Sequence, residues 1–174
     1  MQDDISDGVK KLIADGIADP KRICIVGWSY GGYAALAGAT LSPDLYACTI
    51  AGAGVSDLPL ILATETREHG RDSTVLAYWN NFIGDRWSNA DRLNAASPAK
   101  HAAAVKGPVM LIHGEDDYTV RINQSEAMED ALKAAGKKVT FIRIPKETHY
   151  LQSQSTRQIF LSEMEKFLKE NIGN

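Results

Sequence analysis

The chain has 174 residues, 44% of them hydrophobic, and a formal net charge of −3 at pH 7. This length and composition predict one domain over residues 1–174 with one substantial core. Scattered basic residues argue against a nucleic-acid partner, and no apolar run approaches the roughly 20 residues of a membrane span. Cys24 and Cys48 lie in apolar runs. They are predicted to be small buried hydrophobic residues, not partners in a disulfide or ligands of a metal. The predicted location is the cytoplasm.

Helix and strand patterns alternate along the chain. A first helix, with apolar residues at helical spacing up to Ile17, is expected to end before Asp19-Pro20. Residues 57–104 lack a strand pattern and predict short helices and loops. The expected strands cover 23–26, 47–51, 109–112 and 139–144, and the expected longer helices cover about 30–41, 123–135 and 153–170. The alternation predicts an α/β fold, a mostly parallel sheet with helices on both faces and a site at the strands' carboxyl ends.

The junction between the first strand and the following helix has the sequence Gly-Trp-Ser-Tyr-Gly-Gly over residues 27–32. A serine at such a turn is held in a strained backbone conformation that exposes its hydroxyl. Gly27 and Gly31 are expected to be required because a Cβ there would collide with the neighbouring strand or helix. Ser29 is therefore a candidate nucleophile, although the pattern alone also fits a flexible glycine turn.

An acidic loop follows the third strand and a histidine loop follows the fourth. They carry Asp117 and His149, at the same edge of the sheet as Ser29. His149 would take the serine proton, and Asp117 would orient the imidazole and stabilise the imidazolium. A solvated histidine and acids that interact with a helix dipole are the alternatives. The order of the three residues along the chain favours a triad.

The other three histidines are expected to have ordinary roles. His69 and His101 lie in the polar middle region. His113 ends the third strand and is expected to hydrogen-bond the backbone rather than to react.

Three segments together resemble the prolyl oligopeptidase family of serine peptidases, within the α/β-hydrolase superfamily. They are residues 27–33, the His113-Gly114-x-x-Asp117-x-x-Val120 segment with Gln124-Ser125, and the late His149. The chain is most similar to the acylaminoacyl-peptidase and dipeptidyl-peptidase branches. The family pattern puts the catalytic acid four residues after the strand-end histidine, which selects Asp117 among the neighbouring acids.

The resemblance also implies an amino-terminal β-propeller and earlier sheet strands that have no counterpart in this sequence. The chain is thus expected to be a partial α/β-hydrolase fold with its N-terminal strands missing. The Tyr30 N–H would donate to the oxyanion, but the loop that carries a second donor is absent, which predicts weakened activity. The unpaired strand over 23–26 is expected to be covered in a homo-oligomer.

The substrate pocket is predicted near the second strand. Proline-preferring members of the family have aromatic residues there, whereas this chain has Val55, Leu58 and Ile61. These residues favour a general apolar group, with plain core packing as the alternative.

The sequence as a whole predicts a serine hydrolase that cleaves small peptides or esters through an acyl-enzyme, without a metal or an organic cofactor. The alternative is a catalytically inactive fragment that acts only as a folded or assembly module. A dinucleotide-binding turn is disfavoured because Ser29 stands where that motif has its second glycine.

Overall fold

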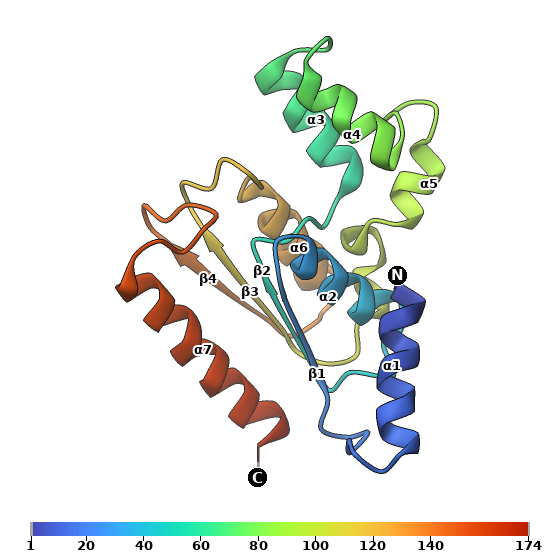
Figure 1. Ribbon diagram of the computed structural model, residues 1–174, viewed down its shortest axis with the longest axis vertical. Coiled ribbons are helices and arrows are strands. Elements are labelled where there is room, and N and C mark those ends of the chain that lie inside the picture. The colour runs from blue at the N-terminus through green and yellow to red at the C-terminus, as the bar shows by residue number, and fades with distance from the viewer. Residues whose placement is uncertain (1, 174) are drawn as a thin grey trace.

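Four parallel strands form the central layer of the computed structural model, which describes residues 2–173 (Figure 1). Their order in the sheet, β1-β2-β3-β4, is also their order along the chain. They are β1 (Cys24–Trp28), β2 (Cys48–Gly52), β3 (Val109–Gly114) and β4 (Val139–Ile144). Each strand ends within two residues of the predicted position, and the predicted parallel α/β architecture is confirmed.

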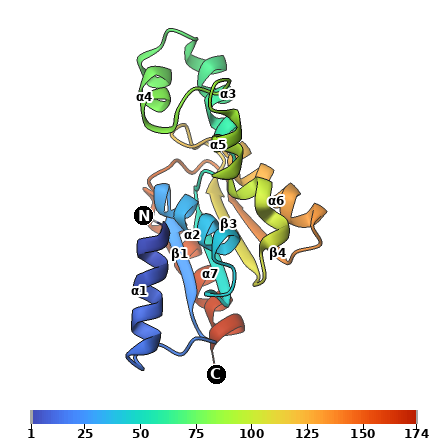
Figure 2. The ribbon, with the colours of Figure 1, turned by 90° about the vertical axis from the view of Figure 1, so that its right-hand side faces the viewer.

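Helices cover both faces of the sheet (Figures 1 and 2). Helices α2 (Tyr30–Leu41), η1 (Pro98–Ala104) and α6 (Asn123–Ala134) pack on one face, and α7 (Gln154–Ile172) packs on the other. Successive residues of β3 serve the two faces in turn. Leu111 packs with Leu36 and Met128 beneath α2 and α6, whereas Met110 packs with Phe167 of α7. Every residue of β3 is buried, as the continuous apolar run predicts.

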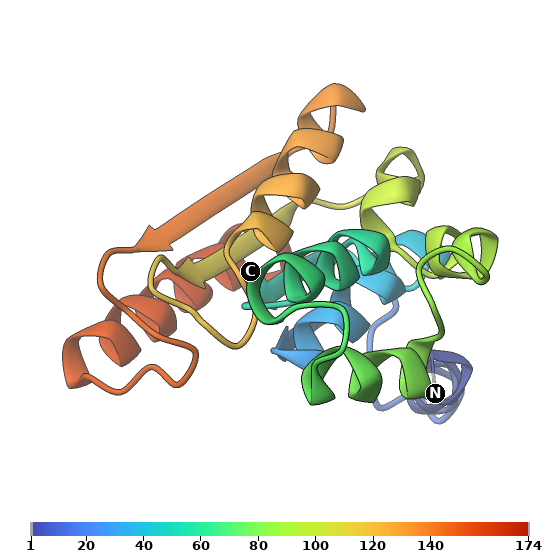
Figure 3. The same cartoon turned by 90° about the horizontal axis from the view of Figure 1, so that it is seen from above.

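Three further helices form a cap at the carboxyl ends of the strands. They are α3 (Leu58–His69), α4 (Thr74–Ile83) and α5 (Ala90–Ala95), and we call them the helical cap. Figures 1 and 2 show the cap at one end of the molecule, and Figure 3 looks down onto it. Leu62, Leu76 and Leu93 form its own small core. No strand occurs in this described segment, as predicted.

Helix α1 (Gln2–Ala14) is shorter than the apolar spacing predicts. It was expected to include Ile17, which instead follows the helix and is 72% exposed. Gly16 adopts a left-handed conformation with a φ of 72°, and the amide of Ile17 returns to the carbonyl of Leu12. These contacts end the helix as a glycine C-cap does. None of the helices within residues 2–173 combines the length and apolar character that crossing a bilayer requires.

The expectation that the two cysteines are unlinked is wrong. The structure joins Cys24 and Cys48 by a disulfide, with Cα atoms 4.6 Å apart. The two residues are register partners on β1 and β2, so their side chains leave the sheet on the same face. Spacing along the chain does not reveal that register. Because disulfides are rare in a reducing cytoplasm, the cysteines give no support to a cytoplasmic location.

Candidate active site

Ser29 lies between β1 and α2, in a backbone conformation that residues other than glycine rarely adopt. Its φ is 58° and its ψ is −121°. Among the described residues, three more non-glycine residues have a positive φ: Ala53, which follows β2, and Lys146 and Leu151, which flank His149. All four lie in the loops that leave the carboxyl ends of strands. Strained backbone of this kind clusters at functional sites.

The glycines around Ser29 differ in what they permit. A Cβ on Gly27 would lie 2.0 Å from the carbonyl oxygen of Gly31, so this glycine is required, as predicted. A Cβ on Gly31 would meet no atom within 4 Å, so that part of the prediction is wrong. The required glycine is the next one, Gly32, whose Cβ would approach the Gly52 carbonyl oxygen to 2.6 Å. The close approach of α2 to the end of β2 therefore depends on Gly32.

A chain of two hydrogen bonds joins the three residues that the sequence predicts. His149 Nε2 lies 2.8 Å from Ser29 Oγ, and His149 Nδ1 lies 2.7 Å from Asp117 Oδ2. A carboxylate only accepts, so Nδ1 carries the ring proton and Nε2 is left to accept from the serine hydroxyl. This is the tautomer that a general base needs in order to take a proton from Ser29.

The carboxylate of Asp117 is buried and held from two sides. Its Oδ1 accepts the backbone N–H groups of Thr119 and Val120, each at 2.8 Å. Its Oδ2 faces both His149 and Nε2 of His113, which lies 3.2 Å away. Burial by itself would raise the pKa of Asp117, but the hydrogen bonds from His113, His149 and Val120 outweigh it and lower the pKa. The side chain therefore remains an anion across the neutral range.

Two residues that the sequence did not single out hold the His149 loop. The indole N–H of Trp28 donates to the carbonyl oxygen of His149 at 3.0 Å, which ties the loop to the serine turn. Buried Glu147 accepts the backbone N–H groups of Thr148 and Gln152 at 2.9 and 3.2 Å. The signal for Trp28 lies in the motif itself, where it directly precedes Ser29. Glu147 lies two residues before His149 and had no signal beyond that proximity.

The acid loop and the histidine loop are joined through their backbones. The amide of Asp116 donates to the carbonyl of Glu147 at 3.0 Å. Burial would raise the pKa of Glu147, but bonds from the Thr156 side chain and from the Thr148 and Gln152 amides together lower it. An ionised Glu147 thus keeps the loop that carries the histidine in place.

An apolar hollow of about 340 Å³ opens beside Ser29, between the sheet and the helical cap. Of the three residues predicted for a substrate pocket, Val55 and Leu58 line this hollow. Ile61 does not, since it lies further along α3 and is buried in the core of the cap. Three aromatic side chains also line the hollow: Tyr30 and Tyr33 of α2 and Trp79 of α4. The sequence did not predict them as part of the pocket. The complete lining is Ser29, Tyr30, Tyr33, Val55, Leu58, Trp79, Ile83, Thr119 and Val120.

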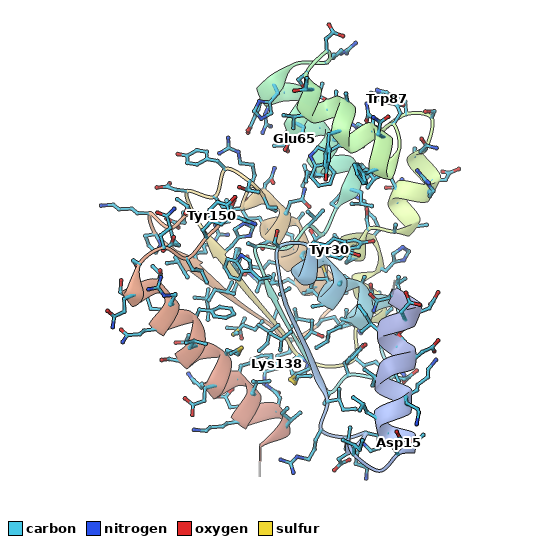
Figure 4. The ribbon with its side chains drawn as sticks, viewed as in Figure 1. Asp15, Tyr30, Glu65, Trp87, Lys138 and Tyr150 are labelled. Atoms are coloured by element: carbon cyan, nitrogen blue, oxygen red, sulfur yellow. A yellow bond between two sulfur atoms is a disulfide. The ribbon has the colours of Figure 1, made fainter. Side chains whose placement is uncertain are left out.

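A second and more open hollow, of about 530 Å³, lies on the other side of Ser29. Its lining is Trp28, Ser29, His149, Tyr150, Leu151 and Phe160. Figure 4 shows Tyr30, which lines the first hollow, and Tyr150, which lines the second, at the end of the sheet below the helical cap. Within residues 2–173, no group of three or more histidine, cysteine or acidic side chains is arranged to hold a metal ion.

Comparison with known proteins shows which family the chain belongs to. The sequence matches the profile of the Prolyl oligopeptidase family over residues 1–174. The chain belongs to this family. The resemblance that the serine, acid and histidine segments indicate is thereby confirmed.

Three relatives that match this chain are considerably longer than it. Dipeptidyl aminopeptidase BIII of Pseudoxanthomonas mexicana is 31% identical over 182 residues, which cover 99% of this chain and 25% of the relative. Acylaminoacyl peptidase of Pyrococcus horikoshii matches with a TM-score of 0.86 and 28% identity, over 99% of this chain and 28% of that structure. An acylaminoacyl peptidase in complex with Z-Gly-Gly-Phe-chloromethyl ketone matches with a TM-score of 0.85, 28% identity and the same coverage. The chain spans about a quarter of the length of these prolyl oligopeptidase family members.

The lowered pKa values of Asp117 and Glu147 predict how stability depends on pH. A carboxyl whose pKa is lower in the folded state stabilises the fold above its unfolded pKa, and this contribution disappears as pH falls through the folded value. The ordinary value for Asp117 is 3.8. We expect the urea midpoint of the wild type to fall steeply below about pH 4. The slope should be shallower in Asp117→Asn and unchanged in Asp116→Asn, a control at an exposed neighbour. Equal slopes for the wild type and Asp117→Asn would contradict the prediction.

Proposed function

We propose that this chain is the serine-hydrolase part of a peptidase, and that it cleaves peptide or ester bonds through an acyl-enzyme. The observation that carries the proposal is the hydrogen-bond chain from Ser29 Oγ through His149 to Asp117 Oδ2. Membership of the prolyl oligopeptidase family and the peptidase names of the relatives support the same activity.

In the first half of the proposed reaction, Ser29 Oγ attacks the substrate carbonyl carbon while its proton passes to His149 Nε2. The carbonyl oxygen becomes an oxyanion in a tetrahedral intermediate. This intermediate collapses, and the leaving amine or alcohol takes the proton from His149. In the second half, a water molecule gives a proton to His149 and attacks the acyl carbon. The bond from this carbon to Ser29 Oγ then breaks, which releases the acid. Oγ takes the proton back from His149, so the Ser29 hydroxyl is restored. Asp117 stabilises the imidazolium in both halves.

The oxyanion would form near the start of α2, where Tyr30 is the first helical residue. Amides in the first turn of a helix point out of its N-terminus, at the positive end of the helix dipole. The backbone N–H of Tyr30 is thus the proposed donor to the oxyanion. Loss of a single oxyanion-hole donor in a serine protease lowers turnover by about 10²–10³. Loss of the Tyr30 donor would therefore be expected to lower turnover by a similar factor.

The apolar hollow beside Ser29 is the proposed site for the acyl side of the substrate. Apart from Ser29 and Thr119 it is lined by aliphatic and aromatic side chains, and no charged group lines it. The hydroxyl of Tyr33 donates to the carbonyl of Ala96 at 3.1 Å, so it is already paired. Burial, and then the proximity of Tyr30, raise the pKa of Tyr33, which keeps the ring neutral. We infer a preference for apolar or aromatic acyl groups, with the leaving group directed to the second hollow.

We further propose that β1 is covered by a second copy of the chain. In the described residues β1 pairs with β2 alone, and Val26 in its middle is 44% exposed. Parallel sheets are rarely left with an exposed apolar edge, because free N–H and C=O groups there recruit other strands. Two copies related by a twofold axis would pair β1 with β1.

Labelling by a fluorophosphonate probe tests the proposed nucleophile. We expect the wild type and the exposed-serine control Ser155→Ala to be labelled, and Ser29→Ala to remain unlabelled. His149→Gln should lose on the order of 10⁴ or more in labelling rate, because the base is gone. Folding of each variant is checked by circular dichroism. A folded wild type that does not react with the probe would support the inactive assembly module instead.

The acyl pocket is tested with a series of p-nitrophenyl esters from acetate to hexanoate. Each added CH₂ that enters the hollow should raise kcat/KM by up to about fourfold, from roughly 0.8 kcal/mol of apolar burial. Ile83→Asn should flatten this dependence, because Ile83 lines the hollow. Phe82→Asn, at the neighbouring exposed position, should not. A flat dependence in the wild type would place the acyl chain elsewhere.

The proposed pairing of β1 predicts a dimer or larger assembly in sedimentation velocity. Val26→Lys adds a charge in the middle of the exposed strand and should shift the population to monomer. Protection of the β1 amides from hydrogen exchange should be lost in the same variant. A wild type that sediments as a single monomer, with freely exchanging β1 amides, would refute the pairing.

A further inference from the structure

His113 is buried completely, yet each of its ring nitrogens has a polar partner. Nε2 lies 2.8 Å from the carbonyl oxygen of Val120 and 3.2 Å from Oδ2 of Asp117. Nδ1 lies 2.8 Å from the hydroxyl of Ser125, on α6. The sequence predicts only a backbone hydrogen bond for this residue. That bond is present, but the ring also reaches the acid of the candidate site.

The partners fix which nitrogen carries the proton. A carbonyl oxygen and a carboxylate both only accept, so Nε2 is protonated. Its N–H donates to the Val120 carbonyl oxygen, and Oδ2 of Asp117 lies 3.2 Å from the same nitrogen. In the neutral ring Nδ1 is then an acceptor, and the hydroxyl of Ser125 donates to it. Ser125 thereby stabilises the tautomer with the proton on Nε2, the nitrogen that lies beside the carboxylate of Asp117. His113 and Ser125 together form an ordered polar pair beneath the acid.

We propose that His113 is a positioning residue that holds Oδ2 of Asp117 in line with His149 and shares the charge of that oxygen. The proposal rests on the hydrolase function proposed above. The same oxygen accepts from His149 Nδ1 at 2.7 Å, so two imidazoles divide one acceptor. Because Oδ1 is held by two backbone amides, the bond from His113 completes the fixation of the carboxylate.

The other charged groups near His113 are paired with one another and do not compete for its contact with Asp117. Its register partner on β4 is Arg143, which pairs with Glu126 and Glu129 of α6 at 2.7 and 3.8 Å. Asp117 lies on the other side, with His149 beyond it. The carboxylate of Asp117 is therefore the charge that the His113 N–H meets directly.

Removal of the His113 donor should shift the deprotonation of His149 in a predictable direction. Without His113, the negative charge on Oδ2 acts on His149 alone and stabilises its imidazolium more strongly. The pH at which His149 loses its proton then rises, and the acidic limb of kcat/KM moves to higher pH. Oδ2 would also be held by His149 alone and less firmly in line with it, so kcat should fall about tenfold, which corresponds to about one hydrogen bond, with little change in KM.

The experiment compares His113→Leu, which removes the donor, with His113→Gln, whose amide nitrogen restores a donor at the position of Nε2. His101→Leu is the control, because His101 contacts the Ala95 carbonyl and lies outside the hydrogen-bond chain. The pH dependence of p-nitrophenyl ester hydrolysis is measured, and each rate is divided by the concentration of sites that the fluorophosphonate probe labels. The titration of the His149 ring is followed separately by NMR. We expect an upward shift in His113→Leu, recovery toward the wild-type value in His113→Gln and no shift in the control.

The NMR titration separates the failure of this proposal from the failure of the proposed function. An ester-inactive wild type would refute the hydrolase, yet the midpoint of His149 would still report on His113. A merely structural role would lower the thermal midpoint of His113→Leu without moving that titration. Ser125→Ala, which keeps the ring but removes its tautomer partner, should shift the His149 midpoint in the same direction by a smaller amount. If all these variants keep the wild-type midpoint, His113 does not position the acid.

Discussion

Asp117 places a full negative charge in the interior of the molecule, and the geometry around it follows from the need to compensate that charge. Burial of an unpaired carboxylate is costly, so each oxygen must be met by donors. Two backbone amides of the acid loop meet one oxygen, and two histidine rings, from the end of β3 and the loop after β4, meet the other. These bonds fix the acid loop and orient His149 toward Ser29. The site thus depends on one anion whose partners come from separate strands.

Much of the fold and of the hydrogen-bond chain could be predicted because the relevant signals are local. Apolar runs bounded by glycine and proline locate the strands, and the glycine-rich turn marks Ser29. A parallel sheet brings the carboxyl ends of its strands to one edge, so Asp117 and His149 needed only their positions after strands to be placed near Ser29. For these residues, the topology of the sheet is enough to predict proximity from their order along the chain.

The features that could not be predicted depend on register and on packing between distant segments. The pairing of Cys24 with Cys48 requires knowledge that β1 and β2 align these residues. The aromatic lining by Trp79 requires the position of the helical cap over the sheet. The requirement for Gly32 rather than Gly31 depends on how closely α2 approaches β2. In each case the deciding contact joins elements whose relative placement no local pattern encodes.

The bond from the Trp28 indole to the carbonyl of His149 joins residues 121 positions apart, and the bond between Ser29 and His149 spans 120. Contacts of such long sequence separation carry a large loop-closure entropy, which the other contacts of the fold must offset. The nucleophile and its base lie on the loops that follow β1 and β4, the first and last strands of the sheet order, so their contact depends on the arrangement of all four strands. The reaction of Ser29 with a covalent probe would then report that the whole sheet is folded. In a mixture of folded and unfolded molecules, the labelled fraction would give the fraction that is native.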